Sequence, residues 1–204
     1  VAAKQYLTDA TLASMRNVKV VNACRSYRYQ SIGYYVSLLA EARGHKPFPT
    51  VQTIQDLKST TMAKIVSSDL DELIQASMKH LTSDKFTLSI YFGHNLSKCH
   101  DKLAASLFQH FPAPFLQAQF NKANGHWVLQ NISALSFGDV LSEHKEFALQ
   151  SCKAFLKKGV ASKKQIQTRF DLAILYNPAE QNFPSNEKAI QKFLKAAIQV
   201  GFDP

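Results

Sequence analysis

The sequence predicts an α/β (α+β) fold, in which helices flank a small mixed sheet that includes a β-hairpin, followed by a strand and a helix of a second module. Three observations predict it. A β-branched run at residues 18–24 precedes a helical apolar stripe, residues 115–132 alternate with a period of two, and residues 170–204 repeat the order of strand then helix. The 204 residues are 46% hydrophobic and 19% charged, which excludes collagen-like and fully disordered classes.

The first part of the chain predicts a strand, a loop and a helix in succession. Residues 18–24 (VKVVNAC) have the length and β-branched content of a strand, and residues 25–30 form a polar, aromatic connection. Residues 31–43 carry apolar side chains at three-and-four spacing, with Ser31 as the N-cap. Residues 45–51 contain two prolines and predict an edge strand or an extended connection.

The middle of the chain predicts a second helix, a strand and a third helix. Ser68 is predicted to cap the second helix, because acidic residues follow it in the first turn. Residues 86–92 (FTLSIYF) predict a strand that ends at Gly93. The third helix is predicted to be capped by Asn95 and to end before Pro112.

A hairpin and one more helix complete the predicted domain. Apolar and polar residues alternate from residue 115, and Asn124-Gly125 is a strong signal for a tight turn before a returning strand through Trp127. Ser142 is predicted to open a helix that Gly159 closes. We therefore expect one α+β domain over residues 1–159.

The remaining residues predict a linker and the start of another module. Residues 160–169 are polar and basic, residues 170–177 predict a strand, and Ser185 is expected to cap a final helix. A strand that leads into a crossover helix ordinarily has a parallel strand after it. We therefore expect residues 170–204 to be a truncated α/β module of a longer polypeptide, or the last helix to dock on the first domain.

The positive net charge of the chain favours an anionic partner. Lys and Arg number 24 against 15 Asp and Glu, which gives a net charge of +9. Much of the excess lies late, at a predicted helix end and in the linker, where cations complement the helix dipole or stay solvated, so nucleic acid is not the expected partner. Binding of nucleic acid by this basic segment stays open as an alternative; its cations are Lys145, Lys153, Lys157, Lys158, Lys163, Lys164 and Arg169.

Cysteine usage and hydropathy indicate a cytoplasmic protein. The three cysteines, Cys24, Cys99 and Cys152, are odd in number and far apart, so they do not form a disulfide framework. No apolar run approaches the roughly 20 residues that a membrane helix needs, so no membrane partner is expected.

Residues 22–35 (NACRSYRYQSIGYY) form the candidate ligand site. They place arginines and tyrosines at the carboxyl end of a strand and the amino end of a helix, where ligands of open α/β sheets bind and where an anion is favoured. The alternative is structural: the tyrosines pack over the sheet edge and the arginines pair with acids. The candidate ligand-binding residues are Arg25, Tyr27, Arg28, Tyr29, Gln30, Gly33, Tyr34, Tyr35 and His45.

A second hypothesis makes the domain itself a small enzyme that acts on peptides or amides. Cys24 would be its nucleophile and His45 its base. Against it, a cysteine at the end of an apolar strand is usually a small buried hydrophobe. The common nucleotide-binding and zinc-binding motifs are absent, and Cys99-His100 does not have a metal-ligand spacing, so no metal site is expected.

Four segments carry a family resemblance: residues 28–46 (RYQSIGYYVSLLAEARGHK), 69–74 (DLDELI), 89–96 (SIYFGHNL) and 111–120 (FPAPFLQAQF). They resemble the N-terminal domain found ahead of RimK-like ATP-grasp ligases, often called RLAN, and the likeness extends over residues 6–155. Residues 171–197 resemble the segment that leads into the ATP-grasp module of such proteins.

This resemblance implies that the parent protein is an ATP-dependent ligase, which activates a carboxylate as an acyl phosphate and joins it to the amine of an amino acid or peptide. ATP and magnesium are implied for the ATP-grasp module, which is absent here, so no cofactor and no independent catalysis are expected of this chain. The expected role is that of an accessory domain, whose partners are the ATP-grasp module of the same polypeptide and an acidic amino acid or peptide substrate.

Overall fold

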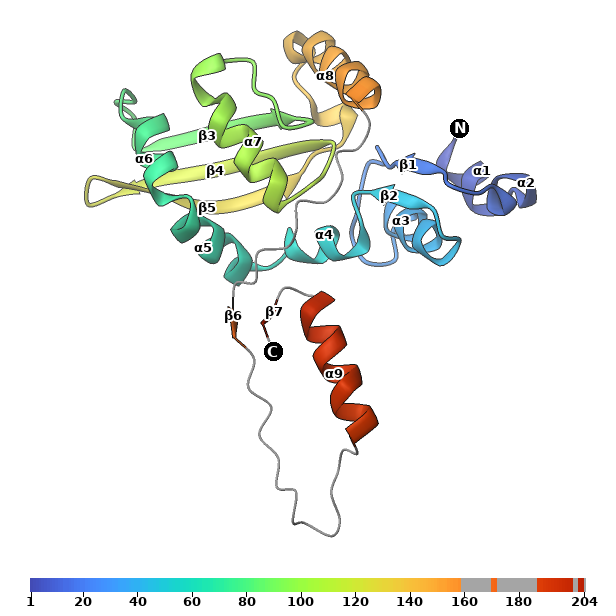
Figure 1. The fold of residues 1–204 in the computed structure, drawn as a ribbon. Coiled ribbons are helices and arrows are strands. Elements are labelled where there is room, and N and C mark those ends of the chain that lie inside the picture. The colour runs from blue at the N-terminus through green and yellow to red at the C-terminus, as the bar shows by residue number, and fades with distance from the viewer. Residues whose placement is uncertain (159–169, 172–186, 200–201, 204) are drawn as a thin grey trace. The chain divides into compact units, whose positions relative to one another are not determined.

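The computed structural model describes residues 1–158, 170–171, 187–199 and 202–203. The chain divides into two units, Val1–Lys158 and Gly159–Pro204 (Figure 1). The first unit combines helices with two small sheets, and the described residues of the second unit form one helix and a two-stranded sheet, so the predicted mixed α/β class is confirmed.

A parallel β-α-β motif lies near the N-terminus. Strand β1 (Lys19–Val21) pairs with β2 (Lys46–Phe48), and helix α3 (Ile32–Ala42) connects them. The predicted strand is confirmed but is shorter than residues 18–24. Ser31 caps α3 as predicted, since its hydroxyl oxygen accepts a hydrogen bond from the Tyr34 N–H at 3.3 Å.

Two short helices precede β1, and sequence patterns did not predict them. They are α1 (Ala3–Thr8) and α2 (Ala10–Ser14). Asp9 caps α2 by accepting hydrogen bonds from the Thr11 and Leu12 N–H groups. Helix α1 packs against α3, where Tyr6, Val36 and Ala40 form a small buried cluster. Helices this short take their stability from such packing rather than from propensity.

Three helices follow β2, and their boundaries correct one prediction. They are α4 (Val51–Asp56), α5 (Thr60–Asp69) and α6 (Asp71–Met78). Ser68 is not an N-cap, because it lies inside α5, and the break between the two helices falls at Leu70. The acidic residues of the predicted first turn, Asp71 and Glu72, do begin α6.

The main sheet is antiparallel, with β4 in its centre. It consists of β3 (Lys85–Tyr91), β4 (Phe115–Ala123) and β5 (His126–Ala134) in the order β3-β4-β5. The predicted hairpin is confirmed: both turn residues, Asn124 and Gly125, have positive φ, at 52° and 80°. This conformation matches a tight hairpin turn to the twist of the strands.

Helix α7 (Asp101–His110) follows a 3-10 turn, η1 (Lys98–His100). Asn95 does not cap this helix, which corrects the prediction. Its amide donates to the Ser89 carbonyl oxygen at 2.7 Å and its side-chain oxygen accepts from the Ser97 N–H, so Asn95 stabilises the loop instead. As predicted, the helix ends before Pro112.

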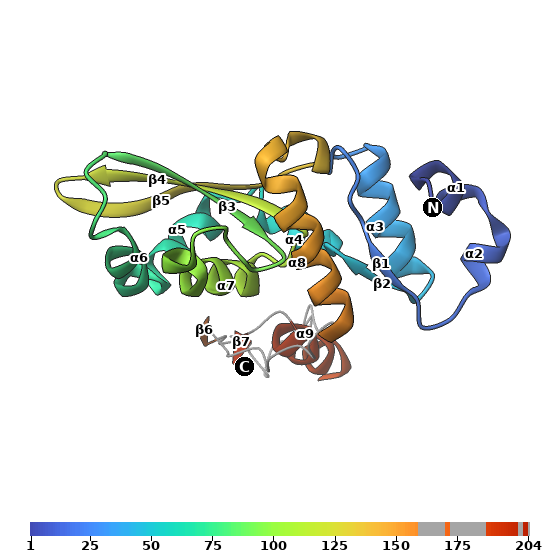
Figure 2. The same cartoon turned by 90° about the horizontal axis from the view of Figure 1, so that it is seen from above.

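Helices α5, α6 and α7 cover one face of the sheet (Figure 2). The strands present alternate residues to this core, and the opposite face carries polar residues such as Gln119 and Asn131. Full burial of each such apolar side chain contributes about 1.5–3 kcal/mol. The fully buried members include Leu88, Ile90, Leu116 and Ala118 from the sheet, and Val66, Ile74, Met78, Leu103 and Leu107 from the helices.

A second, aromatic core joins the β-α-β motif to the main sheet. Phe48 of β2 stacks on Phe155 of α8 (Lys145–Lys158), with ring centroids 5.0 Å apart, and Phe92 lies 5.1 Å from the same ring. The predicted start at Ser142 is the first residue of a 3-10 turn, η3 (Ser142–His144), directly before α8. A second 3-10 turn, η2 (Phe137–Asp139), precedes it. Because the two sheets share this core, Val1–Lys158 forms one unit.

The second unit contains a short parallel strand pair and a helix. Strand β6 (Phe170–Asp171) pairs with β7 (Phe202–Asp203), and α9 (Glu187–Gln199) lies between them in sequence. The parallel strand expected after the helix is therefore within this chain. The predicted linker at residues 160–169 and the predicted cap Ser185 lie outside the described residues. No described helix is both long and apolar enough to cross a membrane.

Candidate functional site

Asn22 organises the junction between β1 and α3. Its side chain is buried; the amide donates to the Gly33 carbonyl oxygen at 2.7 Å and to the Ser37 hydroxyl at 2.9 Å, and the side-chain oxygen accepts from the Cys24 N–H at 3.2 Å. The buried Tyr27 hydroxyl donates to the Asn22 carbonyl oxygen. These bonds hold the chain in a fixed turn after β1 and end the strand there. Asn22 is not among the nine residues predicted from the sequence, although a lone amide side chain at the end of a β-branched run is a signal for such a turn.

Gly33 allows the same turn to pack directly on the start of α3. A Cβ atom at residue 33 would overlap the Ser26 carbonyl oxygen and would lie 2.8 Å from the Cys24 Cβ. The Ser31 hydroxyl donates to that Ser26 carbonyl oxygen at 2.8 Å. The close approach expected at Gly33 is therefore made by the chain's own loop.

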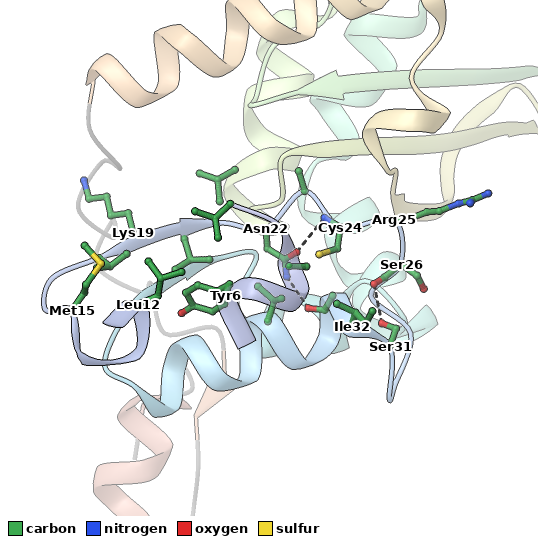
Figure 3. Close-up of a pocket in the computed structure, with 18 residues that line it drawn as sticks. Tyr6, Leu12, Met15, Lys19, Asn22, Cys24, Arg25, Ser26, Ser31 and Ile32 are labelled. Carbon is green, nitrogen blue, oxygen red and sulfur yellow. Dashed lines mark hydrogen bonds between the residues drawn. The ribbon is translucent and has the colours of Figure 1, made fainter. Parts of the chain in front are cut away.

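A cavity of about 900 Å³ lies beside β1, between the turn and helices α1 and α2 (Figure 3). Its walls are mostly apolar, with Tyr6 and Leu12 contributed by the two short helices. Lys19 and Arg25 are the cations of the lining; both are exposed, and Arg25 extends away from the other lining residues (Figure 3). Among the described residues, no aspartate or glutamate belongs to the lining. Its lining residues are Val1, Ala3, Tyr6, Leu12, Met15, Val18, Lys19, Val20, Val21, Asn22, Ala23, Cys24, Arg25, Ser26, Ser31, Ile32, Gly33 and Val36.

The wall opposite β1 is fixed by Arg43. Its guanidinium donates hydrogen bonds to the carbonyl oxygens of Tyr6 at 2.7 Å and Leu7 at 3.0 Å, and its Cζ lies 5.1 Å from the centre of the Tyr6 ring. These bonds join the carboxyl end of α1 to the carboxyl end of α3. Since Tyr6 lines the cavity, Arg43 holds one side of the cavity in place.

The structure does not gather the nine candidate residues into one pocket. Arg25 and Gly33 line the cavity. Tyr27 is buried beneath the turn, and its burial, together with the nearby Cys24, raises its pKa. His45 is buried apart from the lining. The rest lie outside the cavity lining: Arg28, Tyr29, Gln30 and Tyr35 are exposed and Tyr34 is half-buried.

Three of the candidate tyrosines, Tyr29, Tyr34 and Tyr35, form a short aromatic strip outside the cavity. The Tyr34 ring lies edge-on to that of Tyr29, with centroids 5.4 Å apart, and edge-on to that of Tyr35 at 5.8 Å. Tyr29 is 70% exposed, so the strip faces solvent. Gln30 has a positive φ of 64°, which turns the backbone towards the helix start.

Arg25 lies at the rim of the cavity, close to the turn before α8. The Asp139 carboxylate has a lowered pKa, mainly because the Ser136 side chain and backbone donate hydrogen bonds to it, and Arg25 adds to the effect. Within the described part of the chain, Arg25 forms no ion pair closer than 4.0 Å. Its guanidinium therefore remains able to bind an anion.

His45 has structural partners on both ring nitrogens. Nδ1 lies 2.6 Å from the Tyr6 hydroxyl and Nε2 lies 3.0 Å from the Met15 carbonyl oxygen. A carbonyl oxygen only accepts, so Nε2 carries the proton, and Nδ1 accepts from the Tyr6 hydroxyl. Neither nitrogen is left to act as a base for Cys24.

Cys24 is unsuited to nucleophilic catalysis. Its side chain is half-buried, and burial raises the pKa of the thiol. A reactive cysteine needs the opposite shift, since the thiolate is the nucleophile. The geometry therefore does not support the enzyme hypothesis built on Cys24 and His45.

The family of the chain is identified by comparison with family models. Residues 3–151 match the model described as the RimK-like ATP-grasp N-terminal domain. Searches of curated proteins and of solved structures found no match. The matched range contains every described cavity-lining residue except Val1, the turn around Asn22 and the whole antiparallel sheet. The chain therefore belongs to the RimK-like ATP-grasp N-terminal domain family, RLAN.

Proposed function

We propose that Val1–Lys158 is the substrate-binding accessory domain of an ATP-dependent carboxylate–amine ligase and that its ligand is an acidic amino acid or peptide. Membership in the RLAN family supports an accessory role beside an ATP-grasp module of the same polypeptide. The observation that carries the ligand class is the cavity beside β1, whose described lining residues include two exposed cations and no aspartate or glutamate. A mostly apolar site bordered by cations favours anionic groups on an otherwise apolar ligand.

ATP and magnesium are proposed for the companion module and not for this domain. Among the described residues, no group of three or more histidine, cysteine, aspartate and glutamate side chains is placed to hold a metal ion. Catalysis of the ligation step belongs to the ATP-grasp module in this proposal, and this domain supplies recognition.

The cysteines bear on the cellular location of the protein, and the late basic residues bear on nucleic acid as an alternative partner. Cys24, Cys99 and Cys152 are free thiols, which fits the reducing cytoplasm that we propose as its location. In the basic late segment, four cations belong to α8, namely Lys145, Lys153, Lys157 and Lys158, whereas Lys163, Lys164 and Arg169 lie outside the described residues.

Isothermal titration calorimetry on the 204-residue chain tests the proposal. Glutamate, a pentapeptide of alternating glutamate and valine, and the same peptide with glutamine in place of glutamate are titrated in turn. We expect the acidic peptide to bind more tightly than the glutamine peptide, and Arg25→Ala to weaken its binding about tenfold, or about 1.4 kcal/mol. Arg28→Ala is the matched control, because Arg28 is exposed and lies outside the cavity lining. Absence of binding, or equal loss with both variants, would contradict the proposal.

A further inference from the structure

Strand β1 is paired along one edge. The Lys46 N–H donates to the Val18 carbonyl oxygen and the Asn22 N–H donates to that of Phe48, both at 2.8 Å. Backbone groups alternate between the two edges of a strand, so residues 18, 20 and 22 face β2. The N–H and C=O groups of Lys19 and Val21 point to the other edge, and no described residue forms a hydrogen bond with them.

The opposite edge of this two-stranded sheet is closed to pairing. Pro47 lies in the middle of β2 and is buried. Its register opposite Val20 places its missing N–H on the edge that faces away from β1. A proline at this position prevents a further strand from pairing with β2. The sheet can therefore grow only at β1.

The cavity runs along the open edge of β1. Nine consecutive residues, 18–26, line it, and Lys19–Val21 among them form the strand. Successive side chains of a strand point to opposite faces, so all three strand residues can border one cavity only if that cavity follows the strand's edge. From Lys19 to Val21 this edge is about 7 Å long at about 3.3 Å per residue, the length of three residues of an extended peptide.

We propose that the cavity binds an extended acidic peptide as a third strand beside β1. The peptide backbone exchanges hydrogen bonds with Lys19 and Val21, which is recognition by β-strand addition. One side of the added strand meets the apolar wall that carries Tyr6, Leu12 and Met15. Lys19, at the start of the edge, and Arg25, in the turn after β1, bind acidic side chains of the peptide. The preferred sequence therefore alternates apolar and acidic residues.

This inference rests on the proposed function, because it names the backbone chemistry by which the acidic ligand is held. Strand addition also requires particular backbone N–H groups of the peptide, whereas recognition through side chains alone does not. An added strand turns alternate peptide N–H groups towards β1 and the remaining ones away. Only one of the two alternating sets of peptide amides is then essential for binding.

Two backbone-methylated forms of the glutamate–valine pentapeptide test this requirement on the unaltered chain. One form is N-methylated at its valine amides, the other at two of its glutamate amides. We expect one form to lose at least tenfold in affinity and the other to remain within about threefold of the parent peptide, because methylation removes a donor only where the amide faces β1. Equal retention or equal loss in both forms would overturn strand addition.

A pair of variants tests the same edge from the protein side. Lys19→Pro and Lys19→Ala both remove the charge, but only proline removes the N–H on the open edge, and the bonds of β1 to β2 do not use that N–H. We expect the proline variant to bind the peptide at least tenfold more weakly than the alanine variant. If circular dichroism shows that the Lys19→Pro variant does not fold, the binding of the two methylated peptides tests strand addition instead.

The outcomes separate the two proposals. Binding that needs Arg25 but tolerates methylation at either set would retain the proposed function and overturn strand addition. Absence of peptide binding would overturn both. If the chain dimerises in sedimentation and Lys19→Pro abolishes the dimer while the peptide has no effect, the occupant of the edge is a second copy of the chain, and the peptide proposal is wrong.

Discussion

The carbonyl oxygen of Ser26 occupies the space that the Cβ atom of any other residue would take at Gly33. This contact places the turn after β1 directly on the first turn of α3. The backbone on both sides is fixed, with Ser26 bonded to the Ser31 hydroxyl and Gly33 bonded to the Asn22 amide. The part of the cavity lining formed by the turn after β1 and the start of α3 therefore requires glycine at residue 33.

Gly33→Ala is expected to destabilise the domain by about 3 kcal/mol, because neither the carbonyl of Ser26 nor the helix backbone can move away cheaply. Urea unfolding of the two proteins measures the change. Gly138→Ala is the matched control, since the nearest atom to its added Cβ is the Ser136 hydroxyl at 3.5 Å, an ordinary contact. Equal stability of the Gly33 variant and the parent chain would show that the turn is not packed as described.

Asn22→Ala is expected to lower the free energy of unfolding by about 2–3 kcal/mol. The substitution leaves the Gly33 carbonyl oxygen and the Cys24 N–H without their side-chain partner, and a buried group left unpaired costs about 1–3 kcal/mol. Asn131→Ala on the exposed face of β5 should change stability by less than about 0.5 kcal/mol. Similar losses in both variants, again measured by urea unfolding, would argue against the special role of Asn22.

Tyr6→Phe is expected to destabilise the domain by about 1–3 kcal/mol, because it leaves Nδ1 of the buried His45 without a donor. Tyr29→Phe serves as the control, as its ring is 70% exposed. Thermal unfolding followed by circular dichroism compares the two. If the two variants melt alike, the hydrogen bond between Tyr6 and His45 does not hold the wall of the cavity.

Local patterns predicted the parts of the fold that local chemistry determines. The hairpin followed from a period of two and from Asn124-Gly125, and α3 followed from its apolar stripe and its cap at Ser31. Helices α4 and α5 were missed because α4 is six residues long and α5 opens with two β-branched threonines, so packing rather than propensity stabilises them.

The candidate site was predicted less completely than the fold, because it depends on tertiary contacts between segments that are distant in sequence. The segment at residues 22–35 was located correctly at a strand–helix junction, but its members separate into cavity lining, buried scaffold and exposed strip. Tyr6, Leu12 and Met15 complete the cavity from short helices without a periodic signal. The open edge of β1 depends on which strands pair, and that is a tertiary property.

His100 makes the stability of the domain depend on pH. Its ring is buried, lies 4.9 Å from the Phe86 ring and is hydrogen-bonded to the Ser77 hydroxyl, and burial lowers its pKa from the ordinary 6.5. Below pH 6.5 the unfolded chain therefore binds a proton that the folded chain does not, so stability falls as the pH decreases towards the lowered pKa.

Urea unfolding at pH 7.5, 6.5 and 5.5 tests this linkage against His100→Gln, which keeps a polar side chain but cannot titrate. The stability of the parent chain relative to the variant should decrease as the pH falls. A relative stability that stays constant or rises over this interval would contradict the burial of a neutral imidazole at this position.

Amide chemical shifts give the most direct test of the central claim that the cavity beside β1 binds an acidic peptide. The glutamate–valine pentapeptide is titrated into the ¹⁵N-labelled 204-residue chain, and two-dimensional ¹H–¹⁵N spectra are recorded. We expect the largest shifts at the Lys19 and Val21 amides, with those of Arg28 and Tyr29 nearly unchanged. Shifts confined to residues 28–30, or no shift at any concentration, would contradict the account.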